Sequence, residues 1–479
     1  MKTQVMNPIL PSWEYIPDVE PRVYGNRLYL YGSHDRFGGN DFCLNDYVVW
    51  SAPVDNLGQM TFHGVIYSPK MDPANLDGKQ NGFAPDCVQG IDGRYYLYYC
   101  LHLSSQVSVA VADTPTGPFH YYGVVHAPDG TVFGQEKSVF CFDPGVLVDD
   151  GRIFLYIGFG LNGDIRQFML SQGFLCDGCY CLELSSDMLT IRSQPILVLP
   201  SAAISSGTSF EGHAFYEASS PRKIGNIYYL VYSSELSHEL CYATAKTPYG
   251  PFTYGGTLIS IGDLGYRGNK VAVNYLENTH GGLVCLKGRW AIFYHRQTNR
   301  CRYARQCCAE WLDFSEGKFY QTEMTSQGLN DGPLIARGYH EARIACNLSS
   351  GKGTTFYPKT GVIDTVHPYF TQEGPEDGKG RAYIANLQSG SWAAFKYFAT
   401  TSENLISIVY RGNGKGTLRV GTTHGHADVA NLSIHSVKHW TTISAPLIAW
   451  VGSKPLYFEY VGNGAIDFAG FEILSHGSD

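Results

Sequence analysis

An internal repeat organises the first two thirds of the chain and limits its fold more than any other feature. A glycine turn followed by an aromatic-rich strand pattern occurs five times, at intervals of 58 to 74 residues, beginning at Gly25, Gly93, Gly151, Gly225 and Gly288. After most copies comes an alternating segment that ends in a Pro–Gly turn, so each repeat offers about four strands. Four-stranded sheets repeated around an axis are the blades of a propeller. The sequence therefore predicts an all-β chain with a five-bladed β-propeller over residues 1–330.

A polar residue precedes each of these glycines at a nearly constant distance. It stands seven or eight positions upstream, as Asp18, Asp86, Asp143, Glu217 and His280. The first strand of each propeller blade lines the central channel, so equal positions in the repeat should reach equal heights. The alternative for any single position is a turn cap, a role that Asp often takes before Pro or Gly. Five residues at one offset favour a ring at one end of the channel.

Four carboxylates in one ring would repel each other, so some of their pKa values must be raised. Two carboxyl groups that flank a glycosidic bond are the common machinery of glycoside hydrolysis. One carboxylic acid protonates the leaving oxygen, and the other, ionised, activates a water molecule. Residues across a propeller channel suit the wider separation of roughly 6.5–9.5 Å, which inverts the anomeric centre. A third carboxylate near the acid would raise the pKa of that acid.

The composition narrows the choice of partners. The net charge is −8, aromatic residues make up 14%, and no long Lys/Arg run occurs. This argues against nucleic acid or an anionic membrane as a partner, and no window approaches the ~20 apolar residues of a membrane helix. The start of the chain has no signal-peptide core, so we expect a cytoplasmic protein unless a leader has been removed. No organic cofactor is expected, and no oligomeric state is indicated.

Four segments resemble glycoside hydrolase family 43. They are NPILPSWEYIPDVEPRVYGNRLYLYGSHD, FDPGVLVDDGRIFLYIGFG, FYEASSPRKIGNIYYLVYS and NTHGGLVCLKGRWAIFYHR. The resemblance covers about residues 7–330 and implies a five-bladed propeller. It also implies an exo-acting, inverting hydrolase that releases α-L-arabinofuranose or β-D-xylose from pentose-containing oligosaccharides or polysaccharides, such as fragments of arabinoxylan or arabinan.

The resemblance implies three catalytic roles. Asp18 matches the general base, Glu217 matches the general acid, and Asp143 matches the aspartate that tunes the pKa of the acid; Glu211 is the reserve candidate for the acid. Two departures from the family pattern leave the substrate open. Val19 follows the base where Pro is common, and Ala-Ser follows Glu217 in place of Gly-Pro.

The same resemblance implies further site residues. His280 matches a histidine beside a structural Ca²⁺ ion in the channel, with a metal-free, hydrogen-bonded histidine as the alternative. Arg296 matches an arginine that reaches into the sugar pocket, with a salt bridge at a blade edge as the alternative. Phe83 is expected to stack on the sugar, and Asp86 to contact substrate or to be structural.

The last third of the chain reads as a separate unit. Residues 331–339 are predicted to form a linker, and residues 340–479 contain about nine short alternating segments typical of a β-sandwich. The ending KPLYFEYVGNGAIDFAGFEIL resembles carbohydrate-binding module family 6. The resemblance implies that aromatic residues such as Trp392, Trp440 or Tyr397 stack on sugars. Alternatively, the unit only packs on the propeller and shapes the rim of its pocket.

Two other functions remain open at this level. A non-catalytic propeller would bind sugar without turning it over. A glycoside phosphorylase would need a basic phosphate pocket beside Asp18, and no Arg/Lys cluster stands near the channel motifs. The sequence does not separate an arabinofuranosidase from a xylosidase, because both need the same three carboxyl groups.

Overall fold

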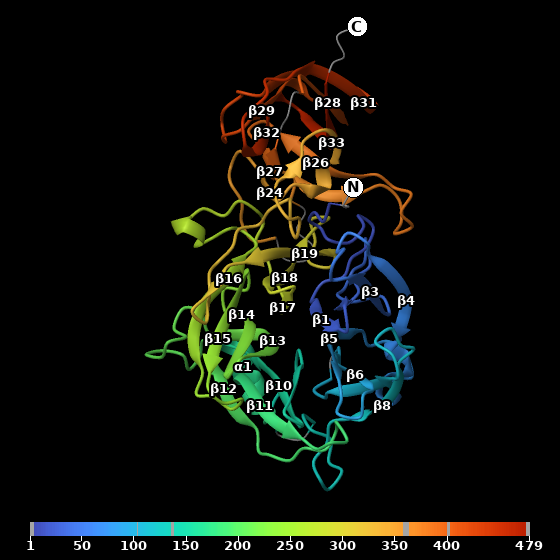
Figure 1. The fold of residues 1–479 in the computed structure, drawn as a ribbon, viewed down its shortest axis with the longest axis vertical. Coiled ribbons are helices and arrows are strands. Elements are labelled where there is room, and N and C mark those ends of the chain that lie inside the picture. Colours follow the sequence, from blue (N-terminus) through green and yellow to red (C-terminus); the bar gives the residue numbers. More distant parts are fainter. Residues whose placement is uncertain (1–3, 103, 136–137, 358–363, 400–402, 476–479) are drawn as a thin grey trace.

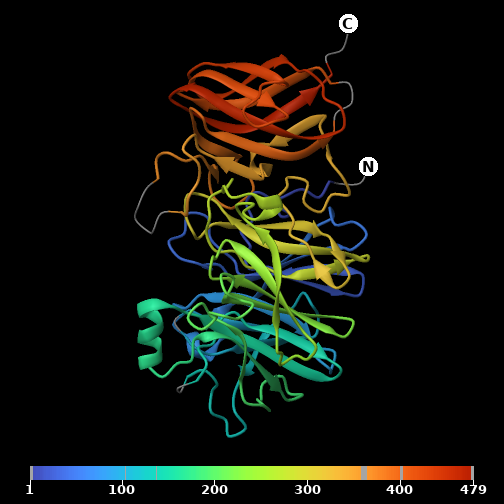
Figure 2. The ribbon, with the colours of Figure 1, turned by 90° about the vertical axis from the view of Figure 1, so that its left-hand side faces the viewer.

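The computed structural model describes residues 4–102, 104–135, 138–357, 364–399 and 403–475. The chain folds into a wheel of five small sheets, followed by a double-layered β-structure (Figure 1). Seen from the side, the second body lies against the rim of the wheel (Figure 2). The predicted all-β fold, a five-bladed β-propeller with a C-terminal β-sandwich, is confirmed.

Each blade is an antiparallel sheet whose strands pair in chain order. Blade 1 contains β1 (Glu20–Tyr24), β2 (Arg27–Tyr31), β3 (Tyr47–Pro53) and β4 (Thr61–Tyr67). Blade 2 contains β5 (Gly82–Gln89), β6 (Tyr95–Leu101), β7 (Ser108–Ala112) and β8 (His120–Val124). Blade 3 contains β9 (Gly145–Asp149), β10 (Arg152–Gly160), β11 (Asp177–Leu184) and β12 (Ile196–Pro200). Blade 4 contains β13 (Phe215–Ile224), β14 (Ile227–Ser234), β15 (Glu239–Ala245) and β16 (Thr253–Ser260), and blade 5 contains β17 (Leu283–Leu286), β18 (Arg289–Gln297) and β19 (Arg305–Leu312).

The repeated glycines close tight hairpins between the first two strands of the blades. Gly25 and Gly288 adopt φ values of +60° and +79°, a region that side chains disfavour and that two-residue hairpin turns require. The aromatic strands that follow pack their side chains between neighbouring blades. Each of the five blade-to-blade interfaces is filled by its own cluster of buried apolar residues. The wheel is therefore held together by five small cores around a channel that carries polar groups.

Blade 5 has three strands among the described residues, and the N-terminal segment covers its outer edge. The backbone amide of Ile9 donates to the carbonyl of Cys307 at 3.0 Å, and the amide of Ala309 donates to the Asn7 side chain at 2.9 Å. The start of the chain thus joins the last blade and closes the ring, which ties blade 5 to blade 1.

One α-helix interrupts the strand pattern. The helix α1 (Gly163–Ser171) lies between β10 and β11 and projects from the side of the propeller (Figure 2). None of its residues is buried. A helix without a buried face needs no regular spacing of apolar residues, so the sequence shows no helical periodicity here. Short 3-10 turns occur at Pro69–Met71, Pro73–Asn75, Tyr266–Gly268 and Ala342–Ile344. Within the described ranges, no helix combines the length and apolar character that a membrane crossing needs.

The sandwich consists of two sheets packed over one apolar core. One sheet contains β22 (Leu334–Ile335), β24 (Asn347–Ser349), β27 (Trp392–Ala399), β29 (Lys415–Gly421), β30 (Ala430–Ile434) and β32 (Ser453–Asn463). The other contains β23 (Gly338–Glu341), β25 (Tyr369–Gln372), β26 (Ala382–Gln388), β28 (Leu405–Gly412), β31 (Val437–Pro446) and β33 (Ala465–Leu474). A small hairpin, β20 (Phe314–Ser315) with β21 (Lys318–Phe319), follows blade 5.

The segment predicted as a linker is part of the sandwich. Within residues 331–339, β22 pairs with β27 in one sheet and β23 begins its pairing with β33 in the other. The sequence NDGPLIARG is rich in turn residues and does not indicate these short strands. They form only by pairing with strands at least sixty residues further along the chain.

Candidate active site

Four of the five ring residues lie together where the first strands of their blades begin. Asp18, Asp143, Glu217 and His280 line one cavity of about 500 Å³, and each is 8% exposed or less. They come from blades 1, 3, 4 and 5, at the level of the channel from which β1, β9, β13 and β17 start. The backbone at Asp18 and Asp143 is left-handed, with φ of 56° and 47°. Such a conformation is costly for a residue with a side chain, and it concentrates at functional sites.

Asp86, the fifth predicted member, lies deeper in the channel. In blades 1, 3, 4 and 5 a two-residue turn joins the first two strands, whereas in blade 2 five residues separate Gln89 from Tyr95. Counting back seven positions from Gly93 therefore stops at Asp86, three residues short of the ring position at Phe83. Asp86 instead pairs with Arg22 and accepts a hydrogen bond from the Val146 amide at 2.8 Å. The ring position in blade 2 is held by Phe83, which lines the cavity as expected of a sugar-contacting residue.

Asp18 is held in its ionised form. Burial alone would raise the pKa of Asp18, but the Arg305 guanidinium donates to its Oδ1 at 2.9 Å and His295 Nδ1 lies 3.3 Å away. These neighbours keep the pKa of Asp18 well below its usual range. Arg305 is itself fixed by Asp35, to which it donates from Nε at 2.8 Å and from Nη2 at 3.0 Å. A base that is ionised and clamped in place can accept a proton from water at neutral pH.

Glu217 has the opposite environment. Burial raises the pKa of Glu217 to about 8, and the nearby charge of Asp143 adds to this effect. Among the described residues, no guanidinium or ammonium group forms a salt bridge with Glu217. Glu217 is therefore protonated at neutral pH and can donate a proton to a bound molecule.

His280 connects the two aspartates. Its Nδ1 lies 3.4 Å from Asp143 Oδ2 and 4.0 Å from Asp18 Oδ1. Burial acts to lower the pKa of His280, yet these carboxylates raise it to about 9. Burial raises the pKa of Asp143, whereas His280 and the Ala218 amide, which donates at 3.2 Å, favour its ionised form. A cationic imidazole between two carboxylates reduces the repulsion that the sequence pattern implies.

The wall of the cavity is aromatic and its rim is polar. Phe142 and Phe159 stack at 4.7 Å, and Phe159 packs against Tyr216 at 5.0 Å. At the rim, Arg302 forms an ion pair with Glu277 at 2.8 Å. Aromatic faces with a few fixed polar groups are typical of pockets for small ligands, including sugars.

Arg296 does not reach this cavity, contrary to the sequence-based expectation. Its guanidinium donates to the carbonyl oxygens of Ala345 and Arg343 and lies 3.8 Å from the ring centre of Phe370. All three belong to the C-terminal part of the chain. Arg296 therefore joins the propeller to the sandwich, an interface that motif comparison with a propeller alone does not reveal.

Sequence reasoning also missed several residues of the site. Arg305 and Asp35 fix Asp18, His295 is fully buried beside it, and Phe42 and Arg302 shape the rim. A signal existed for two of them. Asp35 ends the GSHD segment after the first repeat, and Arg305 begins the strand next to the strand of Arg296. Both are charges in buried surroundings, which normally need partners.

Two other places bring potential metal ligands together. His213, Glu239 and Cys241 have ligand atoms within 4.8 Å of one another, but Glu239 already binds His213 at 2.7 Å and Cys241 at 3.3 Å. Burial raises the pKa of the Cys241 thiol well above its usual value, which disfavours the thiolate a metal needs. In the channel, Glu20 Oε1 is a buried oxygen without a hydrogen-bond partner, and Glu20 contributes to the raised pKa of His280.

At this place in the channel a calcium ion would find one free carboxylate oxygen but not a full set of protein ligands. Glu20 offers a carboxylate oxygen, but His280, whose Nδ1 faces Asp143, could offer Nε2 only after losing the proton that its raised pKa favours. Calcium takes six to eight ligands, mostly oxygen, so the ion would be bound largely through water. The residues present therefore fit a hydrated ion.

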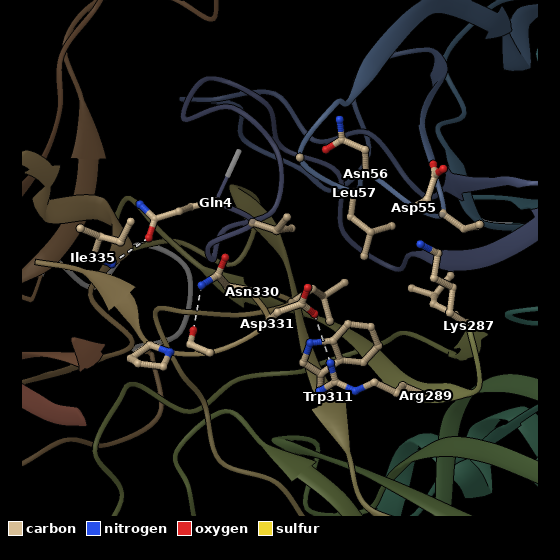
Figure 3. Close-up of a pocket in the computed structure, with 17 residues that line it drawn as sticks. Gln4, Asp55, Asn56, Leu57, Lys287, Arg289, Trp311, Asn330, Asp331 and Ile335 are labelled. Atoms are coloured by element: carbon tan, nitrogen blue, oxygen red, sulfur yellow. Dashed lines mark hydrogen bonds and ion pairs between the residues drawn. The ribbon is translucent and has the colours of Figure 1, made fainter. Parts of the chain in front are cut away.

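A second cavity, of about 530 Å³, lies at the seam of blades 1 and 5 (Figure 3). The Arg289 guanidinium covers the ring of Trp311 at 3.9 Å and pairs with Asp331 at 3.3 Å. Asp55, Asn56 and other residues from the β3–β4 turn complete it. None of the ring residues borders this cavity, so size alone does not identify the site of chemistry.

Comparison with known proteins agrees with the fold and with the family resemblance of the sequence. Residues 5–319 match glycosyl hydrolases family 43. A xylosidase/arabinosidase of Thermoclostridium stercorarium is 43% identical over 99% of this chain and 100% of its own length. Among solved structures, a family 43 enzyme of Xanthomonas citri complexed with xylose has a TM-score of 0.54, at 25% identity over 68% of this chain and 95% of its own. An arabinoxylan arabinofuranohydrolase of Bacillus subtilis has a TM-score of 0.52 at 20% identity and covers 99% of both chains, which extends the likeness in fold to the sandwich. The chain therefore belongs to glycosyl hydrolases family 43 and is a glycoside hydrolase.

Proposed function

We propose that this protein is an exo-acting, inverting hydrolase that releases β-D-xylose or α-L-arabinofuranose from fragments of arabinoxylan or arabinan. One observation carries the proposal: an ionised Asp18 and a protonated Glu217 face the same cavity. The relative named xylosidase/arabinosidase matches over the whole length of the chain and supports the pentose substrate. A compact cavity of about 500 Å³ with a buried floor suits a terminal sugar better than the middle of a polymer.

In this proposal each buried group has one task. Glu217 protonates the glycosidic oxygen as the bond to the leaving group breaks. Asp18 accepts a proton from the water that attacks the anomeric carbon from the opposite face. Asp143 keeps the pKa of Glu217 high, and His280 limits the repulsion between the aspartates.

Asp18 and Glu217 come from blades 1 and 4, which are not neighbours in the ring. We therefore expect the wider carboxyl separation, which leaves room for the attacking water and inverts the product. A calcium ion held by Glu20 and a neutral His280 would take the place of the positive charge that the protonated imidazole otherwise supplies.

The test uses nitrophenyl β-D-xyloside and α-L-arabinofuranoside together with proton NMR of the first anomer formed. Wild-type protein should hydrolyse at least one substrate and yield the inverted sugar. Glu217→Gln should lose far more activity on a xylo-oligosaccharide than on the nitrophenyl glycoside, because nitrophenolate leaves without needing a proton. Asp18→Asn should lose both activities. A retained anomeric configuration would exclude the inverting mechanism.

The phosphorylase alternative has little support in the pocket. Of the described residues that line it, the two arginines are both ion-paired, Arg302 with Glu277 and Arg305 with Asp18 and Asp35. Neither is free to receive phosphate. We therefore expect turnover to be independent of inorganic phosphate, and a strict requirement for it would favour the alternative.

A further inference from the structure

A loop of the propeller, residues 36–45, carries part of the pocket wall. Phe42 and Cys43 line the cavity beside Asp18. Phe42 packs edge-on against Tyr303 at 4.8 Å, and its ring centre lies 4.9 Å from the Arg305 guanidinium, which binds Asp18. The position of this loop therefore decides the shape of the pocket on the side of the base.

The loop is held by bonds among its own residues and by one bond from the neighbouring blade, which the Asn81 side chain donates to the Phe42 carbonyl at 2.9 Å. The Arg36 side chain donates to Asn45 at 2.9 Å, and Asn45 donates to the carbonyl of Asp35 at 2.8 Å. The Cys43 amide donates to Asp35 at 3.1 Å. These bonds join the ends of the loop, while Arg36 and the glycine that follows Phe37 are exposed. The Phe37 amide donates to none of these acceptors, so the exposed stretch around Phe37 depends on support from outside the propeller.

That support comes from the sandwich. Between β25 and β26, the carboxylate of Glu376 accepts a hydrogen bond from the backbone amide of Phe37, and its second oxygen lies 3.5 Å from the Asn45 side-chain nitrogen. Beside this contact, the Tyr15 hydroxyl donates to Gln372 at 2.7 Å. Tyr15 also stacks on Phe37 with ring centres 5.5 Å apart. One carboxylate from the C-terminal body thus holds both ends of the propeller loop.

We propose that Glu376 is a positioning residue through which the sandwich sets the pocket wall that Phe42 forms. The inference rests on the proposed function, because it assigns the wall to sugar binding. Asp18 and Glu217 stand on strand starts outside the loop, and the bonds of Arg305 to Asp18 and Asp35 do not involve Glu376. Loss of Glu376 should therefore weaken substrate binding more than it slows the chemical step.

The test compares Glu376→Ala, Glu376→Gln and Asp377→Ala in the full chain. Asp377 is the matched control, because it is the exposed neighbour and pairs only with Lys379 in its own turn. For a xylo-oligosaccharide, Glu376→Ala should raise KM about tenfold, equivalent to about 1.4 kcal/mol of binding, and change kcat less than about twofold. Glu376→Gln keeps an acceptor for the Phe37 amide and should restore most of KM, and Asp377→Ala should match the wild type.

A second readout does not depend on catalysis. Trypsin can cut the bond between Arg36 and Phe37, whose amide is the group that Glu376 binds. Glu376→Ala should speed this cut, and Asp377→Ala should not, because cleavage follows the population of the open loop.

Unchanged KM and unchanged cleavage in Glu376→Ala would overturn the inference, and so would a lower melting temperature with KM unaltered. If the wild type hydrolyses no pentoside, the proposed function fails by itself. The trypsin comparison then still decides whether Glu376 holds the loop.

Discussion

Two levels of the same channel bury charged residues in different ways. At the inner level, Glu20 and Asp86 face Arg222 and Arg22, with contacts of 2.8 Å and 2.7 Å, so each carboxylate has its own guanidinium. At the level of the cavity, Asp18, Asp143 and Glu217 share one arginine and one histidine. Balanced charges hold a structure together, whereas unbalanced ones shift pKa values and prepare groups for chemistry. Burial alone does not distinguish a catalytic carboxylate from a structural one; the number of its partners does.

The largest contrast should come from removing the base. Asp18→Asn keeps the shape of the side chain but removes the proton acceptor, so kcat/KM on both pentosides should fall at least about 1000-fold. The melting temperature should change little, because the Asn oxygen can still accept a bond from Arg305. Near-normal turnover in this variant would remove Asp18 from the role of base.

At the inner level the same kind of change should affect stability instead. Asp86→Ala leaves Arg22 buried without its partner, so unfolding free energy should fall by about 3–5 kcal/mol. The activity per folded molecule should stay within about threefold, because Asp86 lies outside the cavity. Chemical denaturation followed by tryptophan fluorescence measures the first quantity. A large activity loss in fully folded protein would place Asp86 in the site after all.

Glu217, a buried carboxyl group without a cationic partner, should lower the stability of the folded protein when it ionises. Its pKa is raised in the folded state, so between its ordinary value and about 8 the folded protein holds a proton that the unfolded chain has lost. Stability therefore falls as pH rises through this window, and Glu217→Gln removes the penalty. At pH 8 the variant should be more stable than the wild type by about 4 kcal/mol, and at pH 4 the difference should vanish. Equal stability at both pH values would contradict the raised pKa.

The pH–rate profile offers a finer test. Activity should decline as pH rises through about 8, where Glu217 loses its proton. Asp143→Asn removes the neighbouring charge that helps to raise this pKa, so the alkaline limb should move to lower pH. The acid limb should stay in place, since Arg305 remains beside Asp18. An alkaline limb that does not move would show that burial alone sets the pKa.

The smallest catalytic effect is expected at Arg296. Arg296→Met should leave KM and kcat for nitrophenyl pentosides within about twofold, because the guanidinium contacts Ala345 and Arg343 instead of the cavity. The melting temperature should fall. A selective rise in KM without loss of stability would restore the sequence-based role in sugar binding.

The sequence pattern places Asp18, Asp143, Glu217 and His280 at one height of the channel but not Asp86, and both outcomes have one physical cause. In a propeller blade, the number of residues between a position and the hairpin turn indicates the height of that position in the channel. The comparison between blades holds only where their turns have the same length. Blade 2 has the longer turn, and the ring position passes to Phe83. The sequence pattern contained the turn, GIDGR, but not the strand pairing that reveals its length.

The sequence by itself determined the fold class and which chemical groups gather at one end of the channel. It could do so because both follow from local periodicity and from the repeat. The tertiary structure alone decided which partner each charge has. Arg305 meets Asp18 across 287 positions of the chain, and Glu376 meets Phe37 across 339. Such pairs depend on how blades and bodies pack, and the pKa values that give the carboxyl groups their roles depend on those pairs.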